Sequence, residues 1–214
     1  MISKIEEIFN RLSDNISDPK IELHYTNDFT LLIAVILSAR NTDKGVNKVT
    51  FDLFKIIQSP KELLDFGFEN FVNSIRTIGL YKTKASNIFK TANILFENYD
   101  SKIPNTFEAL ISLPGVGRKS ANVILHTLFD NPTIAVDTHV FRVSRRLGFS
   151  EGKTPHKVEE DLMRIIPEKL KPQAHHLLVL HGRYICKARK PKCFECTLKD
   201  LCPTFATLPT KMNL

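Results

Sequence analysis

The sequence predicts an all-α protein of about ten helices joined by short loops. Two observations indicate this class. Apolar residues recur at helical spacing along nearly the whole chain, and no period-two alternation of the kind found in strands extends beyond a few residues. The length of 214 residues suffices for one large hydrophobic core or for two smaller lobes that share an interface. Asn131-Pro132 is a plausible junction between two such lobes.

Stripes of apolar residues mark the individual helices. The first covers residues 5–12, and a run at 31–39 is apolar on all sides, which predicts a buried helix. Further stripes lie at 46–57, 85–96, 121–128, 140–147, 158–166 and 174–178, and a short helix is expected at 107–112. Helix starts are indicated at Thr106 and Thr154-Pro155, and helix ends at Gly79 and Gly148.

The composition is that of a globular protein, with 43% hydrophobic and 25% charged residues. A net charge of +7 suits a polyanionic partner, although many solvated surfaces are also basic. The first residues carry acids where a signal peptide needs a basic start, and the longest apolar run, 31–37, is far too short to span a bilayer. We therefore expect a cytoplasmic protein with no membrane partner, whose cysteines stay reduced.

The segment from Leu113 to Lys119 reads Leu-Pro-Gly-Val-Gly-Arg-Lys and joins a short helix to a longer one. Its two glycines allow a tight turn in which no Cβ blocks the approach of another backbone. The amides of such a turn, with the start of the next helix, form an anion site. We interpret it as a helix–hairpin–helix that grips a DNA phosphate without reading sequence, and an ordinary helix–turn–helix connection is the alternative. The residues assigned to this grip are Gly115, Val116, Gly117 and Arg118.

Lys119 lies in the first turn of the second helix, where the positive end of the helix dipole disfavours a cation. Stability alone would favour an acidic residue at this point. We expect a partly buried lysine that acts uncharged as a nucleophile, because a neutral lysine can form a Schiff base. A surface lysine that touches phosphate is the alternative.

Asp137 precedes a predicted helix in the segment Val136-Asp-Thr-His139. An aspartate at such a point is usually the N-cap of the helix. A cap carboxylate at the mouth of a cleft can also assist the proton transfers of a lysine and stabilise positive charge that develops on a sugar. The two roles are compatible in one residue.

All four cysteines lie within seventeen residues, in the spacing C-x6-C-x2-C-x5-C. This clustering favours a metal centre over four buried structural cysteines, and four thiolates suit either zinc or an iron–sulfur cluster. The loop at 187–192 carries four cations in six residues, and we expect it to contact phosphates, with a solvated basic loop as the alternative. The predicted ligands are Cys186, Cys193, Cys196 and Cys202, and the predicted phosphate contacts are Arg189 and Lys190.

Together these segments resemble the endonuclease III family of DNA glycosylase/lyases over nearly the whole chain. The resemblance rests on residues 113–119, on residues 136–139 and on His181-Gly-Arg-Tyr184, which runs into the cysteines. It implies two helical lobes with DNA bound between them: a six-helix barrel with the hairpin at 21–131, and a second lobe of residues 1–20 and 132–214. It also selects one four-iron four-sulfur (4Fe–4S) cluster, held in the second lobe, over zinc.

The activity implied by this resemblance is base excision repair on double-stranded DNA that contains damaged bases or abasic sites. The damaged nucleotide, an oxidised pyrimidine, is flipped out, Lys119 displaces the base with the help of Asp137, and β-elimination then cuts the strand. Arg40 and Leu80 would fill the vacated space as wedge residues, and His139 would contact DNA. Arg40 stands where the family usually has glutamine, and it can only donate hydrogen bonds. We expect a monomer that associates with the nucleoid through DNA.

Three other functions remain compatible with the sequence. A monofunctional mismatch glycosylase of the same superfamily would share the hairpin, the aspartate and the cysteines, but it lacks a lysine at the position of Lys119 and usually carries a further C-terminal domain. A non-catalytic DNA-binding protein would use the hairpin only to grip phosphate. An electron carrier built on the cluster is the third, and the long helical body and the hairpin argue against it.

Overall fold

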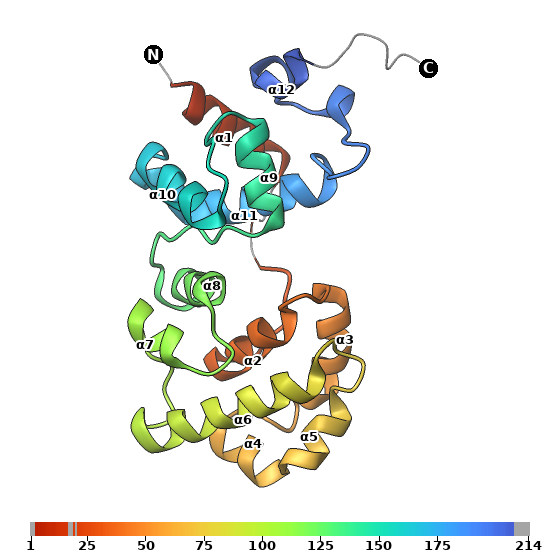
Figure 1. Cartoon of the computed structure of the whole chain (residues 1–214), viewed down its shortest axis with the longest axis vertical. Helices are drawn as coiled ribbons and strands as arrows, with labels where there is room; N and C mark the ends of the chain where they lie inside the picture. Colours follow the sequence, from red (N-terminus) through yellow and green to blue (C-terminus); the bar gives the residue numbers. More distant parts are fainter. Residues whose placement is uncertain (1–2, 17–18, 20, 208–214) are drawn as a thin grey trace. The chain divides into compact units, whose positions relative to one another are not determined.

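The computed structural model describes residues 3–16, 19 and 21–207. Within these residues the chain forms twelve α-helices and three short 3-10 helices, with no strand (Figure 1). The predicted all-α class is therefore confirmed. In the described residues no helix combines the length and the apolar character needed to cross a membrane.

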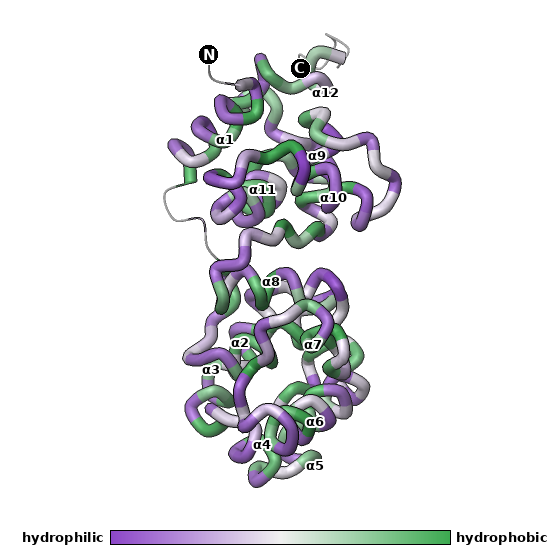
Figure 2. The backbone as a smooth tube through the Cα atoms, turned by 90° about the vertical axis from the view of Figure 1, so that its left-hand side faces the viewer, coloured by the Kyte–Doolittle hydropathy of each residue, from purple (hydrophilic) through white to green (hydrophobic). Residues whose placement is uncertain are grey.

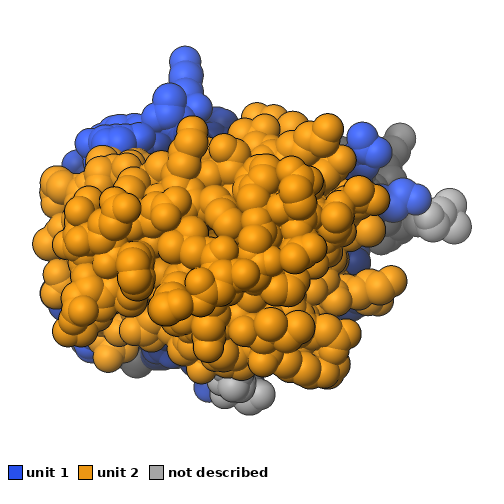
Figure 3. All heavy atoms as spheres, turned by 90° about the horizontal axis from the view of Figure 1, so that it is seen from below, with its two compact units in different colours: residues 1–21, 131–214 blue, residues 22–130 orange. Residues whose placement is uncertain are grey.

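The chain divides into two compact units, coloured separately in Figure 3. Unit 1 comprises Met1–Ile21 and Asn131–Leu214, and unit 2 comprises Glu22–Asp130. Residues 1–2, 17, 18, 20 and 208–214 of the predicted second lobe lie outside the described residues. The functional assignment of the two lobes stays a prediction.

Unit 2 is built around α2 (Asp28–Ser38), whose residues from Phe29 to Leu37 are all buried. The predicted buried helix is thus confirmed. Figure 2 shows the hydropathy of each residue along the backbone. The other helices of the unit are α3 (Asp43–Leu53), α4 (Pro60–Phe66), α5 (Phe68–Ser74), α6 (Tyr81–Asn98), α7 (Phe107–Ser112) and α8 (Arg118–Phe129). Helices α3, α6 and α8 pack against α2, while α4 and α5 pack against α6.

The seven helices of unit 2 are one more than the six that the resemblance implies. The apolar stripes mark five of the seven, and the two that they do not mark are α4 and α5, of seven residues each. Ser59 caps α4 by accepting from the Glu62 N–H, and Pro60 follows at its first position. Gly67 ends α4 and precedes α5, so it separates the two.

Unit 1 joins the N-terminal helix to the C-terminal part of the chain. Its core contains Ile8, Phe9 and Leu12 of the first helix, packed with apolar residues from positions 134–198. Its helices are α1 (Lys4–Asn15), α9 (Thr138–Arg146), α10 (Pro155–Ile165), η1 (Glu168–Leu170), α11 (Lys171–Tyr184), η2 (Cys193–Glu195), η3 (Lys199–Leu201) and α12 (Pro203–Ala206). Helix α11 contacts both α1 and α9, which makes it the centre of the unit.

The capping signals were informative. Thr106 and Thr154 cap α7 and α10 through their hydroxyl oxygens, and Gly148 follows the end of α9 with φ of 75°. The assignment of Gly79 as a helix end was wrong, because α5 already ends at Ser74 and Gly79 lies in the turn that leads to α6.

Candidate active site and cysteine centre

The hairpin between α7 and α8 is held from inside unit 2. Gly115 has φ of 86°, and a Cβ on it would lie 3.0 Å from Asn87 Cβ and 3.2 Å from Ile36 Cγ2. Thr91 Oγ1 donates a hydrogen bond of 2.9 Å to the Pro114 carbonyl. The turn is therefore fixed by a left-handed glycine packed directly against the neighbouring helices.

Val116 contributes to the hairpin mainly as a core residue. Its side chain is only 5% exposed, and its N–H donates to the Leu113 carbonyl at 3.1 Å. The sequence predicts that Val116 contacts DNA. That N–H is used within the hairpin, so it is not available as a donor to a phosphate, and the DNA contact of Val116 stays a prediction.

Gly117 is the N-cap of α8 and has no side chain to cap it. A Cβ placed on Gly117 would meet no atom within 4 Å, so the protein itself leaves open space there. The Arg118 guanidinium lies over the Phe107 ring at 5.1 Å, which keeps it beside the turn. The first N–H groups of a helix have no partner within the helix, so this end of α8 can offer donors to an anion.

Lys119 lies in the first turn of α8, as predicted, but its side chain is exposed. The expected partial burial was therefore wrong. This turn forms part of the surface of unit 2, where Gly117 and Arg118 are exposed as well, because no other element of the unit covers it. An exposed amine at an open hairpin is accessible to a ligand as large as DNA.

Asp137 is the N-cap of α9 in unit 1, and this predicted role is confirmed. Its Oδ1 accepts from the N–H groups of His139 and Val140, both at 2.8 Å, and the residue is half-buried. These two bonds engage Oδ1, which leaves Oδ2 as the atom suited to chemistry. Lys119 belongs to unit 2, and the approach of the two residues to one another stays a prediction.

His139 is held between α9 and α11. A Cβ on Gly182 would lie 2.9 Å from His139 Cβ, so the absence of a side chain at Gly182 permits close packing of the two helices. His139 Nδ1 lies 3.2 Å from Arg142 Nη2. The half-buried ring is thus positioned, and its contact with DNA stays a prediction.

The two predicted wedge residues share an unusual backbone conformation. Arg40 has φ of 60° and Leu80 has φ of 59°, although neither is glycine. Both side chains are exposed, with Leu80 at 62%. Arg40 follows the end of α2 by two residues, and Leu80 is the N-cap of α6.

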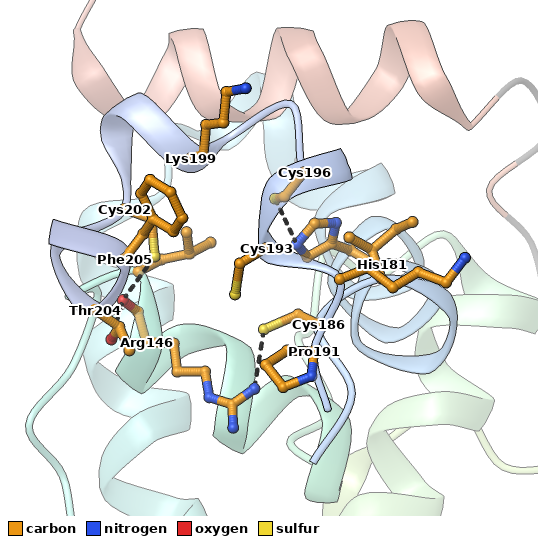
Figure 4. Close-up of a pocket in the computed structure, with 13 residues that line it drawn as sticks. Arg146, His181, Cys186, Pro191, Cys193, Cys196, Lys199, Cys202, Thr204 and Phe205 are labelled. Atoms are coloured by element: carbon orange, nitrogen blue, oxygen red, sulfur yellow. Dashed lines mark hydrogen bonds between the residues drawn. The ribbon is translucent and has the colours of Figure 1, made fainter. Parts of the chain in front are cut away.

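The four cysteines are free thiols that line one cavity of about 100 Å³ in unit 1 (Figure 4). Cys186 lies just beyond α11, Cys193 begins η2, Cys196 follows η2, and Cys202 follows η3. Arg146 and His181 line the same cavity, and His181 Nε2 lies 3.9 Å from Cys196 Sγ. In the part of the chain that the structure describes, no group of three or more His, Cys, Asp or Glu side chains converges closely enough to hold one metal ion.

Burial controls the electrostatics of this cavity. It raises the pKa of the Cys193 and Cys196 thiols, and it lowers the pKa of His181 to about 4, because each charged form loses solvation. Arg146 Nη1 donates to Cys186 Sγ at 3.4 Å. Metal binding would displace protons from the buried thiols.

Two arginines of α9, which sequence reasoning missed, hold the basic loop in place. Arg142 Nε donates to the Cys186 carbonyl at 2.9 Å, and Arg146 donates to the carbonyls of Lys187 at 2.7 Å and Ala188 at 3.3 Å. Their only sequence signal is the basic end of the helix that follows Asp137. The predicted phosphate contacts of this loop, Arg189 and Lys190, are both exposed.

Known proteins similar to this chain share its sequence and its fold. The profile of the HhH-GPD superfamily base excision DNA repair proteins matches residues 33–168. The endonuclease III of Rickettsia conorii is 52% identical over 97% of this chain and 98% of its own length, and that of Escherichia coli is 50% identical over 92% and 93%. The structure of a trapped endonuclease III–DNA covalent intermediate superposes with a TM-score of 0.89, at 42% identity over 96% of this chain and 98% of that one. The chain therefore belongs to the endonuclease III family, within the HhH-GPD superfamily of base excision DNA repair proteins.

Proposed function

We propose that this chain, a DNA glycosylase and AP lyase of base excision repair, removes oxidised pyrimidines with Lys119 as its nucleophile and Asp137 as its carboxylate. The observation that carries this proposal is the placement of Lys119. An exposed amine stands in the first turn of α8, directly beside an open, uncapped hairpin that suits a phosphate. The hairpin would thus bring a deoxyribose to the nucleophile.

The chemistry assigns a separate role to each group. The Lys119 amine attacks the anomeric carbon of the flipped nucleotide, and the base leaves with the electrons of the glycosidic bond and is protonated. The ring opens to a Schiff base, loss of a proton from the adjacent carbon follows, and the 3′ phosphate leaves in β-elimination. Oδ2 of Asp137 would accept or return protons and stabilise the cationic sugar, while Oδ1 keeps its place at the cap.

The remaining predicted DNA contacts fit a duplex that has been opened. Arg40 and Leu80 would fill the space left by the flipped nucleotide, since both are exposed at loop tips. The exposed cations Arg189 and Lys190 would contact phosphates along the backbone. Such binding would associate the protein with the nucleoid.

We also propose that Cys186, Cys193, Cys196 and Cys202 hold a 4Fe–4S cluster. The donor set fits, because four free thiols line a common cavity and Arg146 donates to the Sγ of one of them, Cys186. The cavity, about 100 Å³, is larger than the ~10–15 Å³ that one water-sized sphere occupies, so it has more room than a single ion needs. When bound, the cluster would supply a rigid cross-link between the segments that carry the basic loop.

The decisive experiment is borohydride trapping on a duplex that contains thymine glycol. Borohydride reduces the Schiff base to a stable amine, so wild-type protein should form a covalent adduct and Lys119→Ala should not. Lys61→Ala is the matched control, because Lys61 is likewise an exposed lysine in the first turn of a unit 2 helix. An adduct of undiminished yield with Lys119→Ala would remove this residue from its role.

A further inference from the structure

The backbone at both predicted wedge residues has to be held by something other than their own side chains. A left-handed conformation costs free energy in any residue with a Cβ, and Arg40 and Leu80 both adopt it. Their side chains are exposed. The constraint must therefore come from neighbouring groups in the two loops.

Asn41 ties the two loops together. Its Oδ1 accepts from the Gly79 N–H at 2.9 Å, directly beside Leu80. Its Nδ2 donates to the carbonyls of Leu37 at 2.9 Å and Ala39 at 3.0 Å, directly before Arg40. One side chain thus fixes the backbone next to both wedge residues, across 38 positions of sequence.

Lys84 supports the same point from inside unit 2. It is only 6% exposed, and its Nζ donates to the Leu37 carbonyl at 2.7 Å and to the Ala39 carbonyl at 2.6 Å. A cation at the C-terminal end of α2 also interacts favourably with the helix dipole. Its own N–H donates to the Leu80 carbonyl at 3.0 Å, so Lys84 contacts both loops as well.

We propose that Asn41 and Lys84 are positioning residues that hold Arg40 and Leu80 as one preformed, two-pronged wedge. This inference rests on the proposed function, because a wedge is needed only if a nucleotide leaves the duplex. Loops that are ordered before binding lose less conformational freedom when they enter the DNA. Without these hydrogen bonds, each loop would have to find its strained conformation while the duplex is being opened.

The test compares duplex DNA, which the protein has to open, with DNA that is already single-stranded. Duplex opening is followed by the fluorescence of 2-aminopurine placed beside thymine glycol, and a borohydride trap on a single-stranded oligonucleotide with an abasic site reports the chemistry alone. Asn41→Ala should slow duplex opening and base release by about tenfold, while trapping on the single strand changes less than about twofold. Lys84→Met, which keeps the volume but removes the donors, should act in the same direction.

Two further variants separate positioning from a general loss of structure. Asn41→Asp keeps an acceptor for the Gly79 N–H but turns a second acceptor toward the Leu37 and Ala39 carbonyls, so it should slow duplex opening as Asn41→Ala does and leave single-strand trapping little changed. Asn70→Ala is the matched control, since Asn70 Nδ2 makes a similar bond of 2.8 Å to the Phe66 carbonyl at the end of α4. It should leave both readouts unchanged.

The outcomes for this inference and for the proposed function are distinct. Duplex opening at the wild-type rate in Asn41→Ala would overturn the positioning role. An equal loss of activity on duplex and single strand would also overturn it, because that indicates damage to the fold rather than to the wedge. The proposed function fails instead if Lys119→Ala still forms the adduct, whatever the Asn41 variants do.

Discussion

Replacing Gly115 by alanine should lower the free energy of unfolding by about 2–5 kcal/mol. Its φ of 86° lies in the left-handed region, where a residue with a Cβ loses about 1–2 kcal/mol. The new Cβ would also lie 3.0 Å from Asn87 Cβ and 3.2 Å from Ile36 Cγ2, and overpacking of this kind typically costs about 1–3 kcal/mol. Ile36 is buried in α2 and cannot easily move, so the strain is not relieved.

Gly117→Ala is the matched comparison, two residues further along the same hairpin. No atom lies within 4 Å of the added Cβ, so stability should change by less than about 1 kcal/mol, the ordinary effect of alanine at an N-cap. The same Cβ would fill the space through which a phosphate reaches the amides of α8. Affinity for DNA should therefore fall by about tenfold, as expected when close approach of the backbone is lost.

Two assays separate these effects. Urea unfolding followed by far-ultraviolet circular dichroism gives the stability of each variant, and fluorescence anisotropy with a labelled duplex that carries an abasic-site analogue gives its affinity. We expect Gly115→Ala to be destabilised, and Gly117→Ala to be stable but to bind DNA weakly. A Gly117→Ala variant that binds as tightly as wild type would refute the assignment of this hairpin to the phosphate backbone.

Three further predictions concern the other groups. Asp137→Asn keeps an Oδ1 acceptor and should reduce the rate of base release by about a hundredfold with little loss of stability. Asp137→Ala should in addition lower the free energy of unfolding by about 1 kcal/mol, because the helix cap is lost. Single-turnover kinetics and urea unfolding test both variants, and equal kinetics in Asp137→Asn and wild type would contradict the catalytic role. Purified protein should be brown with about four irons per chain, and Cys193→Ser should lower both, while colourless protein rich in zinc would contradict the cluster. Hydrogen bonds from Ser150 and Lys157 lower the pKa of Asp161. Asp161→Asn should therefore reduce the free energy of unfolding most at pH values above the ordinary carboxyl pKa of 3.8, and the difference from wild type should vanish as the pH falls through the lowered pKa. Urea unfolding across a pH series tests this, and a difference in stability that stays constant with pH would contradict it.

Local signals in the sequence predicted most of the helices and their caps, because a cap depends on residues that are neighbours in the chain. Thr106, Thr154 and Asp137 all cap the helices that follow them. Helices α4 and α5 were missed although Ser59-Pro60 carries a start signal. With seven residues each, they are too short to show an apolar stripe over two full turns.

Local sequence signals could not predict the contacts between residues that lie far apart in the chain. Asn41 is hydrogen-bonded to Gly79, 38 positions away, and Lys84 is hydrogen-bonded to Leu37, 47 positions away. Neither hydrogen bond can be predicted from the residues that surround its partners in the sequence. The left-handed backbone at Arg40 and Leu80 was also not predictable from the sequence, since neither residue type favours this conformation. The exposure of Lys119 was misjudged for a related reason, because burial depends on what the rest of the fold brings to that turn.

Helix α9 connects the proposed carboxylate to the cysteine centre within unit 1. Asp137 caps its first turn, and its last residue, Arg146, donates to Cys186 Sγ and to the Lys187 carbonyl. Nine helical residues span only about 13 Å, so the two ends move as one rigid piece. A cluster that fixes the cysteine loop would also fix Arg146, and through α9 the orientation of Asp137. If the cysteines hold the proposed cluster, its loss should therefore slow base removal through the orientation of Asp137.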